Sequence, residues 1–138
     1  MSGVSIKAVV IGAAIDIGGT LIAGVVFTVI YTAMLLGQGV SEADLQHRIL
    51  SDQSYYVVSL ILGTGFLVSG AFVAARIARA HEIVHAGLVG VVAIATGAFV
   101  IFADTTMYPS WYIPVSFGIT LPVALLAGYV ARRLARPR

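Results

Sequence analysis

Residues 17–36, IGGTLIAGVVFTVIYTAMLL, are twenty consecutive positions without a charged side chain. A helix needs about 20 mostly apolar residues to cross the hydrocarbon of a bilayer, so this stretch is long enough to span a membrane. Its apolar run extends back to about Ala8, and three later stretches have the same character. The sequence therefore predicts four spans, at about 8–36, 56–75, 84–102 and 111–131.

The composition agrees with a membrane protein. Of the 138 residues, 59% are hydrophobic and 10% are charged, whereas a soluble domain is about 45–50% apolar and about 25% charged. We therefore do not expect a soluble monomer, a disordered chain or a nucleic-acid binder. We expect an all-α, integral membrane four-helix bundle that forms a single transmembrane domain over residues 1–138. Because the chain has no cysteine, disulfides, thiol catalysis and cysteine metal sites are excluded.

The basic residues predict the orientation. With the N-terminus in the cytoplasm, Arg48 in the outer loop at 37–55 is the only basic residue outside. The inner basic residues are Lys7, Arg76, Arg79, Arg132, Arg133, Arg136 and Arg138. This positive-inside bias predicts a multi-pass protein of the cell (inner) membrane with both termini cytoplasmic. The first apolar run is too long for a cleavable signal, contains Asp16 and lacks an A-x-A site.

The outer loop contains a signal for a short helix. Ser41 followed three residues later by Asp44 is a capping-box pattern, with Glu42 in the first turn. Leu45, Ile49 and Leu50 then form an apolar stripe. We expect a short amphipathic helix on the outer membrane face, and the alternative is a solvated loop.

The second and fourth spans end alike. Residues 73–79 and 130–136 share the pattern V-A-x-R-[IL]-A-R, which indicates two repeated helical hairpins in the same orientation. The alternative is that helices leaving a membrane inward tend to end in alanine and arginine. Pro122 within the fourth span predicts a kink, because proline removes a helix hydrogen bond.

Asp16 is the leading candidate for chemistry, since ionisable residues inside a span usually face a bundle interior or a wet cavity. It lies on a ridge of small or hydroxyl side chains that recur every four residues: Ala8, Gly12, Asp16, Thr20, Gly24, Thr28 and Thr32. Small ridges let helices approach closely in lipid, so Asp16 is expected on a packing face. The candidate hydrogen-bonding partners at similar depth are Ser69, Thr96 and Thr120. The candidate helix-packing glycines are Gly12, Gly24, Gly63 and Gly90.

Two roles for Asp16 remain open. A buried carboxyl without a level cation suits a proton or cation site. The structural alternatives are a hydrogen-bonded carboxyl that pins the bundle, or an interfacial carboxylate paired with Arg76.

The stretch His81-Glu82-Ile83-Val84-His85 spells H-E-x-x-H. On a helix this spacing puts both imidazoles on one face with a glutamate beside them, as in zinc peptidases. A catalytic zinc needs three protein ligands, and the remaining histidine, His47, is expected on the opposite side of the membrane. The favoured interpretation is an interfacial polar turn with Glu82 paired to Arg79 or Arg76, so we expect no metal and no cofactor.

Two charged features lie at the ends of spans. Asp104 either pairs with Arg48 or is solvated at a helix end. The basic tail, Arg132, Arg133, Arg136 and Arg138, anchors the topology and is expected to contact anionic lipid headgroups.

Two stretches resemble small four-span bacterial membrane proteins. Residues 12–20, GAAIDIGGT, look like a recurring N-terminal feature of such proteins, and so does Val73-Ala74-Ala75-Arg76 leading into Glu82 and His85-Ala86-Gly87. These proteins form uncharacterised families, labelled as domains of unknown function. The resemblance implies a four-helix inner-membrane protein and carries over no activity and no functional residue.

Three functions follow from the sequence. The first is a non-enzymatic accessory or self-associating structural component, with the bilayer and a membrane-protein partner or a second copy as its contacts. The alternative is a small transporter or channel that uses Asp16 as an intramembrane proton or cation site. The remote alternative is a zinc-dependent membrane peptidase that uses His81 and His85.

Overall fold

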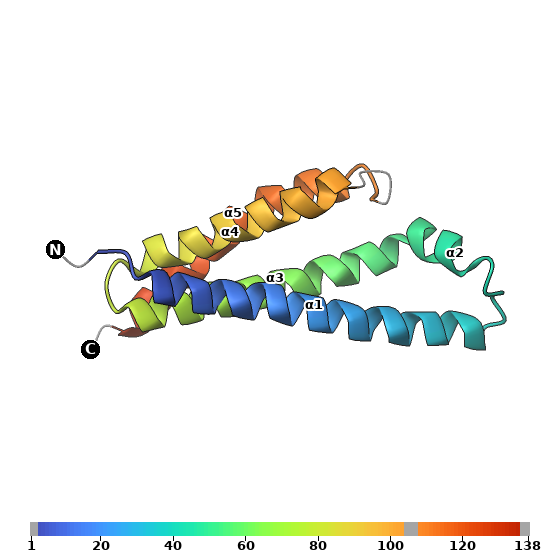
Figure 1. Cartoon of the computed structure of the whole chain (residues 1–138), viewed down its shortest axis with the longest axis horizontal. Coiled ribbons are helices and arrows are strands. Elements are labelled where there is room, and N and C mark those ends of the chain that lie inside the picture. Colours follow the sequence, from blue (N-terminus) through green and yellow to red (C-terminus); the bar gives the residue numbers. More distant parts are fainter. Residues whose placement is uncertain (1–2, 104–107, 136–138) are drawn as a thin grey trace.

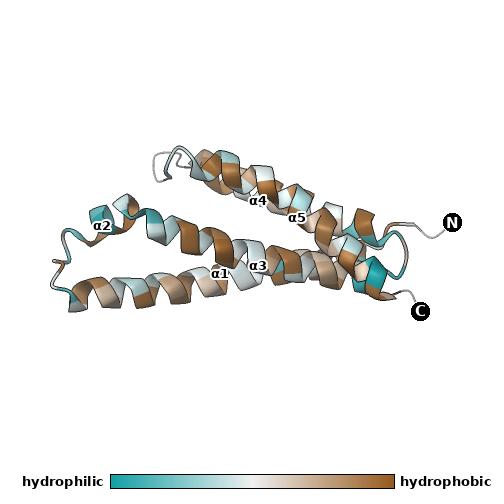
Figure 2. Cartoon of the chain, turned by 180° about the vertical axis from the view of Figure 1, so that it is seen from behind, coloured by the Kyte–Doolittle hydropathy of each residue, from teal (hydrophilic) through white to brown (hydrophobic). Residues whose placement is uncertain are grey.

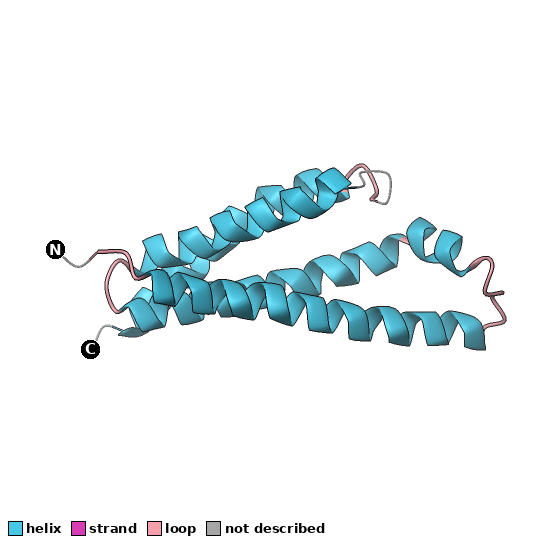
Figure 3. Ribbon diagram, in the orientation of Figure 1, coloured by secondary structure: helices cyan, strands magenta, loops and turns pink. Residues whose placement is uncertain are grey.

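The computed structural model describes residues 3–103 and 108–135, and its secondary structure over these residues is helical (Figure 3). The elements are α1 (Ile6–Gly37), α2 (Leu45–Ser51), α3 (Gln53–Ala78), α4 (Glu82–Ala103) and α5 (Tyr112–Ala135). Helices α1, α3, α4 and α5 are long and apolar enough to cross a membrane. Brown apolar residues run along these helices in Figure 2. The predicted all-α, four-helix membrane bundle is confirmed.

The four long helices form two hairpins that run in the same direction (Figure 1). Helix α1 pairs with α3 and helix α4 pairs with α5, while α3 also lies against α4 and α5. The start of α1 and the end of α5 lie at one end of the bundle, together with the turn at 79–81, and we call this the termini end (Figure 1). The opposite end, which holds residues 38–52 and 108–111, is the loop end.

The core lies at the termini end and is built from small side chains. The buried cluster consists of Leu67, Ala71, Ala74, Ala75, Ala86, Val89, Ala124, Ala127 and Ala131. A Cβ added at Gly12 would lie 2.6 Å from the Gly70 carbonyl oxygen and 2.7 Å from the Ala74 Cβ. The backbones of α1 and α3 therefore approach as closely as glycine allows, as expected for helices that associate in lipid.

The second hairpin uses the same kind of contact. A Cβ added at Gly90 would lie 2.9 Å from the Ala124 Cβ, and one at Gly128 would lie 2.6 Å from the Ala86 Cβ. The two hairpins therefore share both orientation and packing chemistry.

Towards the loop end the two hairpins separate (Figure 1). Aromatic rings still connect them there, because the Tyr56 ring on α3 lies 5.5 Å from the Tyr112 ring on α5, centroid to centroid. Together the ring contacts form an aromatic cluster of Phe27, Tyr31, Tyr55, Tyr56, Tyr108, Trp111 and Tyr112. The cluster therefore gathers rings from α1, α3 and α5 and from the segment at 108–111 near the loop end.

The loop-end segment at 38–52 contains the predicted short helix, α2, but not the predicted cap. The helix begins at Leu45, its N-cap is Asp44, and Asp44 makes no side-chain capping bond. The Ser41 hydroxyl instead donates to the Asp44 carboxylate over 2.6 Å. Asp52 caps α3 by accepting from the Ser54 N–H, and it also accepts from the Tyr31 hydroxyl. The Tyr31 hydrogen bond lowers the pKa of Asp52 below its usual value.

Pro122, where the sequence predicts a kink, lies inside a continuous helix. Helix α5 runs on through this residue, which is exposed. Helix α1 is likewise continuous through Gly18 and Gly19.

Candidate functional site

Asp16 lies directly above the closest contact between α1 and α3. A Cβ added at Gly70 would lie 3.2 Å from the Asp16 Cβ, so Asp16 belongs to this close contact between α1 and α3. The residue is 6% exposed. Within the described part of the chain its carboxylate has no hydrogen-bond or ion-pair partner, which makes it an uncompensated buried acid.

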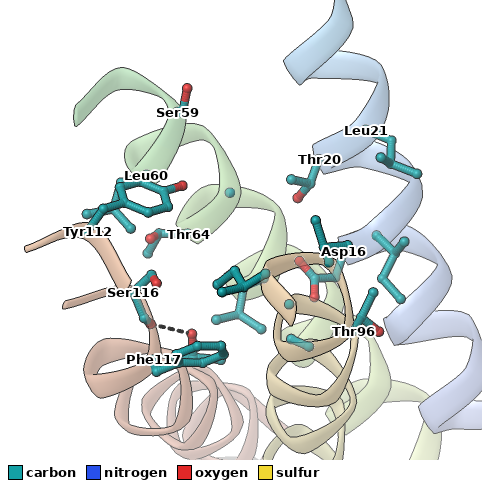
Figure 4. Close-up of a pocket in the computed structure, with 18 of the residues that line it drawn as sticks. Asp16, Thr20, Leu21, Ser59, Leu60, Thr64, Thr96, Tyr112, Ser116 and Phe117 are labelled. Atoms are coloured by element: carbon teal, nitrogen blue, oxygen red, sulfur yellow. Dashed lines mark hydrogen bonds between the residues drawn. The ribbon is translucent and has the colours of Figure 1, made fainter. Parts of the chain in front are cut away.

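Asp16 opens onto a cavity of about 320 Å³ between the two hairpins (Figure 4). All four long helices contribute to its walls. Asp16, Leu67, Ala93 and Thr120 are the lining residues nearest the termini end, and Tyr108 and Tyr112 are nearest the loop end. The cavity therefore runs from the side of the small-residue core that faces the loop end to the aromatic cluster.

The polar atoms of this cavity are oxygens. Besides Asp16, the polar lining consists of the hydroxyl groups of Thr20, Ser59, Thr64, Thr96, Tyr108, Tyr112, Ser116 and Thr120. Lysine, arginine and histidine are absent from the lining that the structure describes. The cavity therefore offers negative charge and hydrogen-bond acceptors, which suit a positively charged or proton-donating ligand.

Several of these hydroxyl protons are already in use. Thr96 donates to the Val92 carbonyl over 2.9 Å, and Thr120 donates to the Ser116 carbonyl over 2.6 Å. Since these protons are committed, the two hydroxyl oxygens are left to act as acceptors. The Thr20 hydroxyl is buried and has no hydrogen-bond partner in the described structure. Asp16 lies one helical turn away on the same wall, where its carboxylate opens onto the cavity and has no partner among the described residues.

The structure brings together Asp16, Thr20, Thr96 and Thr120 but not Ser69. Ser69 lies at the depth of Asp16, beside Gly70, yet its side chain is exposed and donates to the Gly65 carbonyl over 2.9 Å. The expectation that Ser69, Thr96 and Thr120 supply hydrogen bonds to Asp16 is therefore not met among the described residues. Ser69 is turned away from the bundle by the rotation of α3, and Thr96 and Thr120 line the same cavity as Asp16 but donate to backbone carbonyls.

The four candidate packing glycines occupy different environments. Gly12 and Gly90 lie at the close helix contacts of the core. Gly63 lines the cavity, and a Cβ there would lie 3.8 Å from the Thr20 Cγ2. Gly24 has nothing within 4 Å of an added Cβ, so it contacts no other helix.

The H-E-x-x-H pattern does not lie on one helix. Helix α4 begins at Glu82, and His81 precedes it with a positive φ of 53°. His81 is exposed, whereas His85 is 1% exposed. The prediction that both imidazoles share a helical face is wrong, because the turn at 79–81 places His81 outside the helix. The described residues contain no group of three side chains suited to a metal ion.

Both ring nitrogens of His85 are occupied. Nε2 accepts from the Ser5 N–H over 2.8 Å, and Nδ1 lies 3.0 Å from the His81 carbonyl oxygen. Because Ser5 offers only a donor, the proton belongs on Nδ1, and the ring is neutral. His85 therefore ties the start of α1 to the start of α4 and has no nitrogen free for a metal.

The expected ion pairs are not formed among the described residues. Arg76 lies six residues beyond Gly70 on α3, about 9 Å along the helix axis from the level of Asp16. Glu82 has no arginine within ion-pair distance in the described chain. Asp104, Arg136 and Arg138 lie outside the described residues, so the pair of Asp104 with Arg48 stays a prediction.

Much of the cavity wall was not predicted from the sequence, notably Ser59, Thr64, Ser116, Phe117 and Tyr112. The available signal was the spacing of small and hydroxyl residues four apart, which occurs at Ser59 with Gly63 and at Ser116 with Thr120. This is the same spacing that marks the ridge on α1. On α3 the same spacing also joins Gly65 to Ser69, which are both exposed, so the spacing alone does not identify the inward face.

The fold and the site together describe a multi-pass α-helical membrane protein with an acidic cavity between two hairpins. Comparisons with protein-family models, with curated proteins and with solved structures gave no match to this chain.

Proposed function

We propose that this protein is a small membrane transporter or channel that binds a cation at Asp16. The observation that carries the proposal is the buried, unpartnered Asp16 carboxylate at the base of an oxygen-lined cavity. An uncompensated charge costs folding free energy, and a bundle retains it most readily where a ligand supplies the missing partner. A proton or another cation would supply it here.

We further propose that the cavity faces the outside of a bacterial inner membrane. Lys7, Arg76, Arg79, Arg132 and Arg133 lie at the termini end, and Arg48 lies at the loop end. The positive-inside rule then puts the termini end in the cytoplasm. The cavity reaches from Asp16 towards the loop end, so water and ions would enter from the outer side.

Thiol labelling tests this arrangement, because the chain has no cysteine background. Asp16→Cys in intact membranes should react with a small membrane-impermeant thiol reagent applied from the outer side. Ser69→Cys is the matched control, since it lies at the same depth but outside the cavity, and it should stay protected. Asp44→Cys on the exposed loop reports which side the reagent reached. Protection of position 16 from both sides in a folded protein would overturn the proposal.

A flux measurement tests the function itself. Under an imposed gradient, proteoliposomes that contain the wild-type protein should carry a cation current. The cations to be tested are protons, sodium, potassium and a larger cation. Asp16→Asn should abolish this current, and Asp44→Asn should leave it unchanged. An unchanged current in Asp16→Asn would remove Asp16 from the transport path.

Self-association as an accessory or structural component is the second candidate. A shallow groove on α1 is lined by Thr20, Leu21, Gly24, Val25, Thr28 and Val29. Gly24 has open space around it, and Val25 and Val29 are exposed. A helix of a second copy would find small residues there. Gly24→Leu should then convert a defined oligomer to monomer in light scattering, and an unchanged mass would count against this candidate.

A further inference from the structure

The cavity walls distinguish between kinds of cation. Apart from Asp16 and the hydroxyl groups, the walls are apolar, with Ile17, Leu60, Leu67, Ile101 and Phe117 among them. A hard metal cation such as Ca²⁺ or Mg²⁺ takes six or more oxygen ligands at about 2.0–2.6 Å. The cavity has one carboxylate and hydroxyl groups spread over four helices. Such walls favour a ligand with one positive charge and a large apolar surface.

The size and aromatic content agree with that ligand. About 320 Å³ is within the range of pockets for small organic molecules. Phe117, Tyr108 and Tyr112 contribute ring surfaces to the wall. Aromatic faces attract ammonium groups and also pack against apolar substituents.

The cavity also reaches the side of the bundle. Leu21 on α1 and Val100 on α4 both line it, and they are 64% and 52% exposed. Helices α1 and α4 meet near the termini end, where the Cβ of an alanine at position 12 would lie 2.9 Å from the Val89 Cγ2. Beyond that contact the space between them opens laterally. In a membrane this opening faces the lipid, from which an amphipathic molecule can enter.

We propose that the ligand of this cavity is a monovalent organic cation with an apolar body, such as a hydrophobic amine or quaternary ammonium compound. Its positive group would pair with the Asp16 carboxylate, and its apolar groups would lie against Ile17, Leu60 and Phe117. This inference rests on the proposed function and specifies the class of its substrate.

Binding to the full-length protein in detergent tests the inference. The probe is radiolabelled benzyltrimethylammonium, and displacement by its neutral carbon isostere, neopentylbenzene, measures the contribution of the charge. The isostere has the same shape, so it should compete at least about tenfold more weakly than the unlabelled cation. Asp16→Asn should weaken probe binding at least about tenfold, and Asp44→Asn should leave it unchanged.

A second pair of variants leaves the carboxylate in place. Gly63 lines the cavity with room for a side chain, whereas Gly65, two residues along α3, is exposed with nothing within 4 Å of an added Cβ. Gly63→Leu should fill the cavity and abolish probe binding, and Gly65→Leu should retain it. This pair keeps the test decisive if Asp16→Asn fails to fold.

The outcomes separate the inference from the proposed function. Equal competition by neopentylbenzene, or probe binding that is insensitive to Asp16→Asn and Gly63→Leu, overturns the inference. If protons, sodium or potassium give an Asp16-dependent current while benzyltrimethylammonium does not bind, the proposed function stands and the inference fails. If no cation binds or is carried and position 16 is unreactive to thiol reagents, both fail.

Discussion

At the residue scale, Asp16 and His85 are the most deeply buried charged or polar residues of the described bundle, and their hydrogen bonding differs completely. His85 uses both ring nitrogens, towards Ser5 and His81. Asp16 has no partner among the described residues. A buried polar group that is fully paired stabilises a fold, whereas an unpaired one costs free energy. The two residues should therefore respond to substitution in opposite directions.

Replacing Asp16 with leucine should stabilise the protein. Leucine has a similar shape and fits the apolar part of the cavity, and the substitution removes an uncompensated buried carboxylate. We expect the free energy of unfolding in detergent to rise by about 1 kcal/mol. Ser69→Leu, on the exposed face at the same depth, should change it little. A clear loss of stability in Asp16→Leu would show that Asp16 pins the bundle structurally.

Replacing His85 with leucine should destabilise the protein. The change leaves the Ser5 N–H without its acceptor and removes the link between the starts of α1 and α4. The expected loss is about 1–3 kcal/mol in chemical unfolding followed by circular dichroism. His85→Gln, which can present an oxygen to Ser5, should lose less. His47→Leu on exposed α2 should be close to neutral, and equal effects at positions 47 and 85 would contradict the assigned role.

At the element scale, glycine marks where helix backbones meet. The α1–α3 contact brings Gly12 against the Gly70 carbonyl oxygen. Among the other glycines of α1, Gly19 lies against the Phe66 ring, whereas Gly18 has nothing within 4 Å of an added Cβ. Replacing Gly12 and Gly18 each with alanine therefore separates the effect of the helix contact on stability from the effect of helix propensity.

Gly12→Ala should push α1 away from α3. The added methyl would lie 2.6 Å from the Gly70 carbonyl oxygen, which is backbone and cannot rotate aside. We expect a loss of roughly 1–3 kcal/mol, as for overpacked cores. Gly18→Ala should be neutral or slightly stabilising, since alanine has the higher helix propensity. Thermal unfolding of both variants in the same detergent measures the difference, and a similar Tm for the two would refute the contact.

The helices themselves could be predicted from the sequence, but the cavity could not. Hydropathy is a local property, so the runs at 17–36 and 56–75 identify spans without any knowledge of their neighbours. Which side of a span faces the bundle interior depends on how the helix is rotated about its own axis. Ser69 and Thr96 look alike in sequence, yet one is exposed and the other lines the cavity. Helices that are apolar all round carry little information about that rotation.

The prediction drawn from the histidine motif was wrong for a related reason. The spacing of His81 and His85 indicates a shared face only if both residues lie on one helix. The positive φ angles of Arg79 and His81 form a tight turn that delays the start of α4 to Glu82. No sequence pattern identified that turn, because neither residue is a glycine.

At the scale of the whole molecule, two hairpins meet tightly at the termini end and separate towards the loop end (Figure 1). The Tyr56 and Tyr112 rings bridge them near the loop end, 5.5 Å apart. Small-residue packing and aromatic contacts therefore hold opposite ends of the same bundle. The cavity lies between these two regions.

Tyr112→Ala should loosen only the loop end. Loss of the ring removes contacts with Tyr56, Tyr108 and Trp111. We expect faster amide hydrogen exchange near the start of α5, with protection around Val89 and Ala124 unchanged. Tyr129→Ala, near the other end of α5 and exposed, is the matched control and should leave the loop end unaffected. Uniformly faster exchange throughout the bundle in Tyr112→Ala would contradict this division.

A bundle that is narrow at one end and splayed at the other has a wedge-shaped profile. In a bilayer such a wedge takes up more area in one leaflet than in the other. Any change that brings the hairpins together at the loop end would reduce both that area and the cavity volume. Lateral pressure in the leaflet around the loop end therefore acts directly on the cavity between Asp16 and the loop end. Leaflet curvature and lipid headgroup size would then change how readily a ligand enters the cavity.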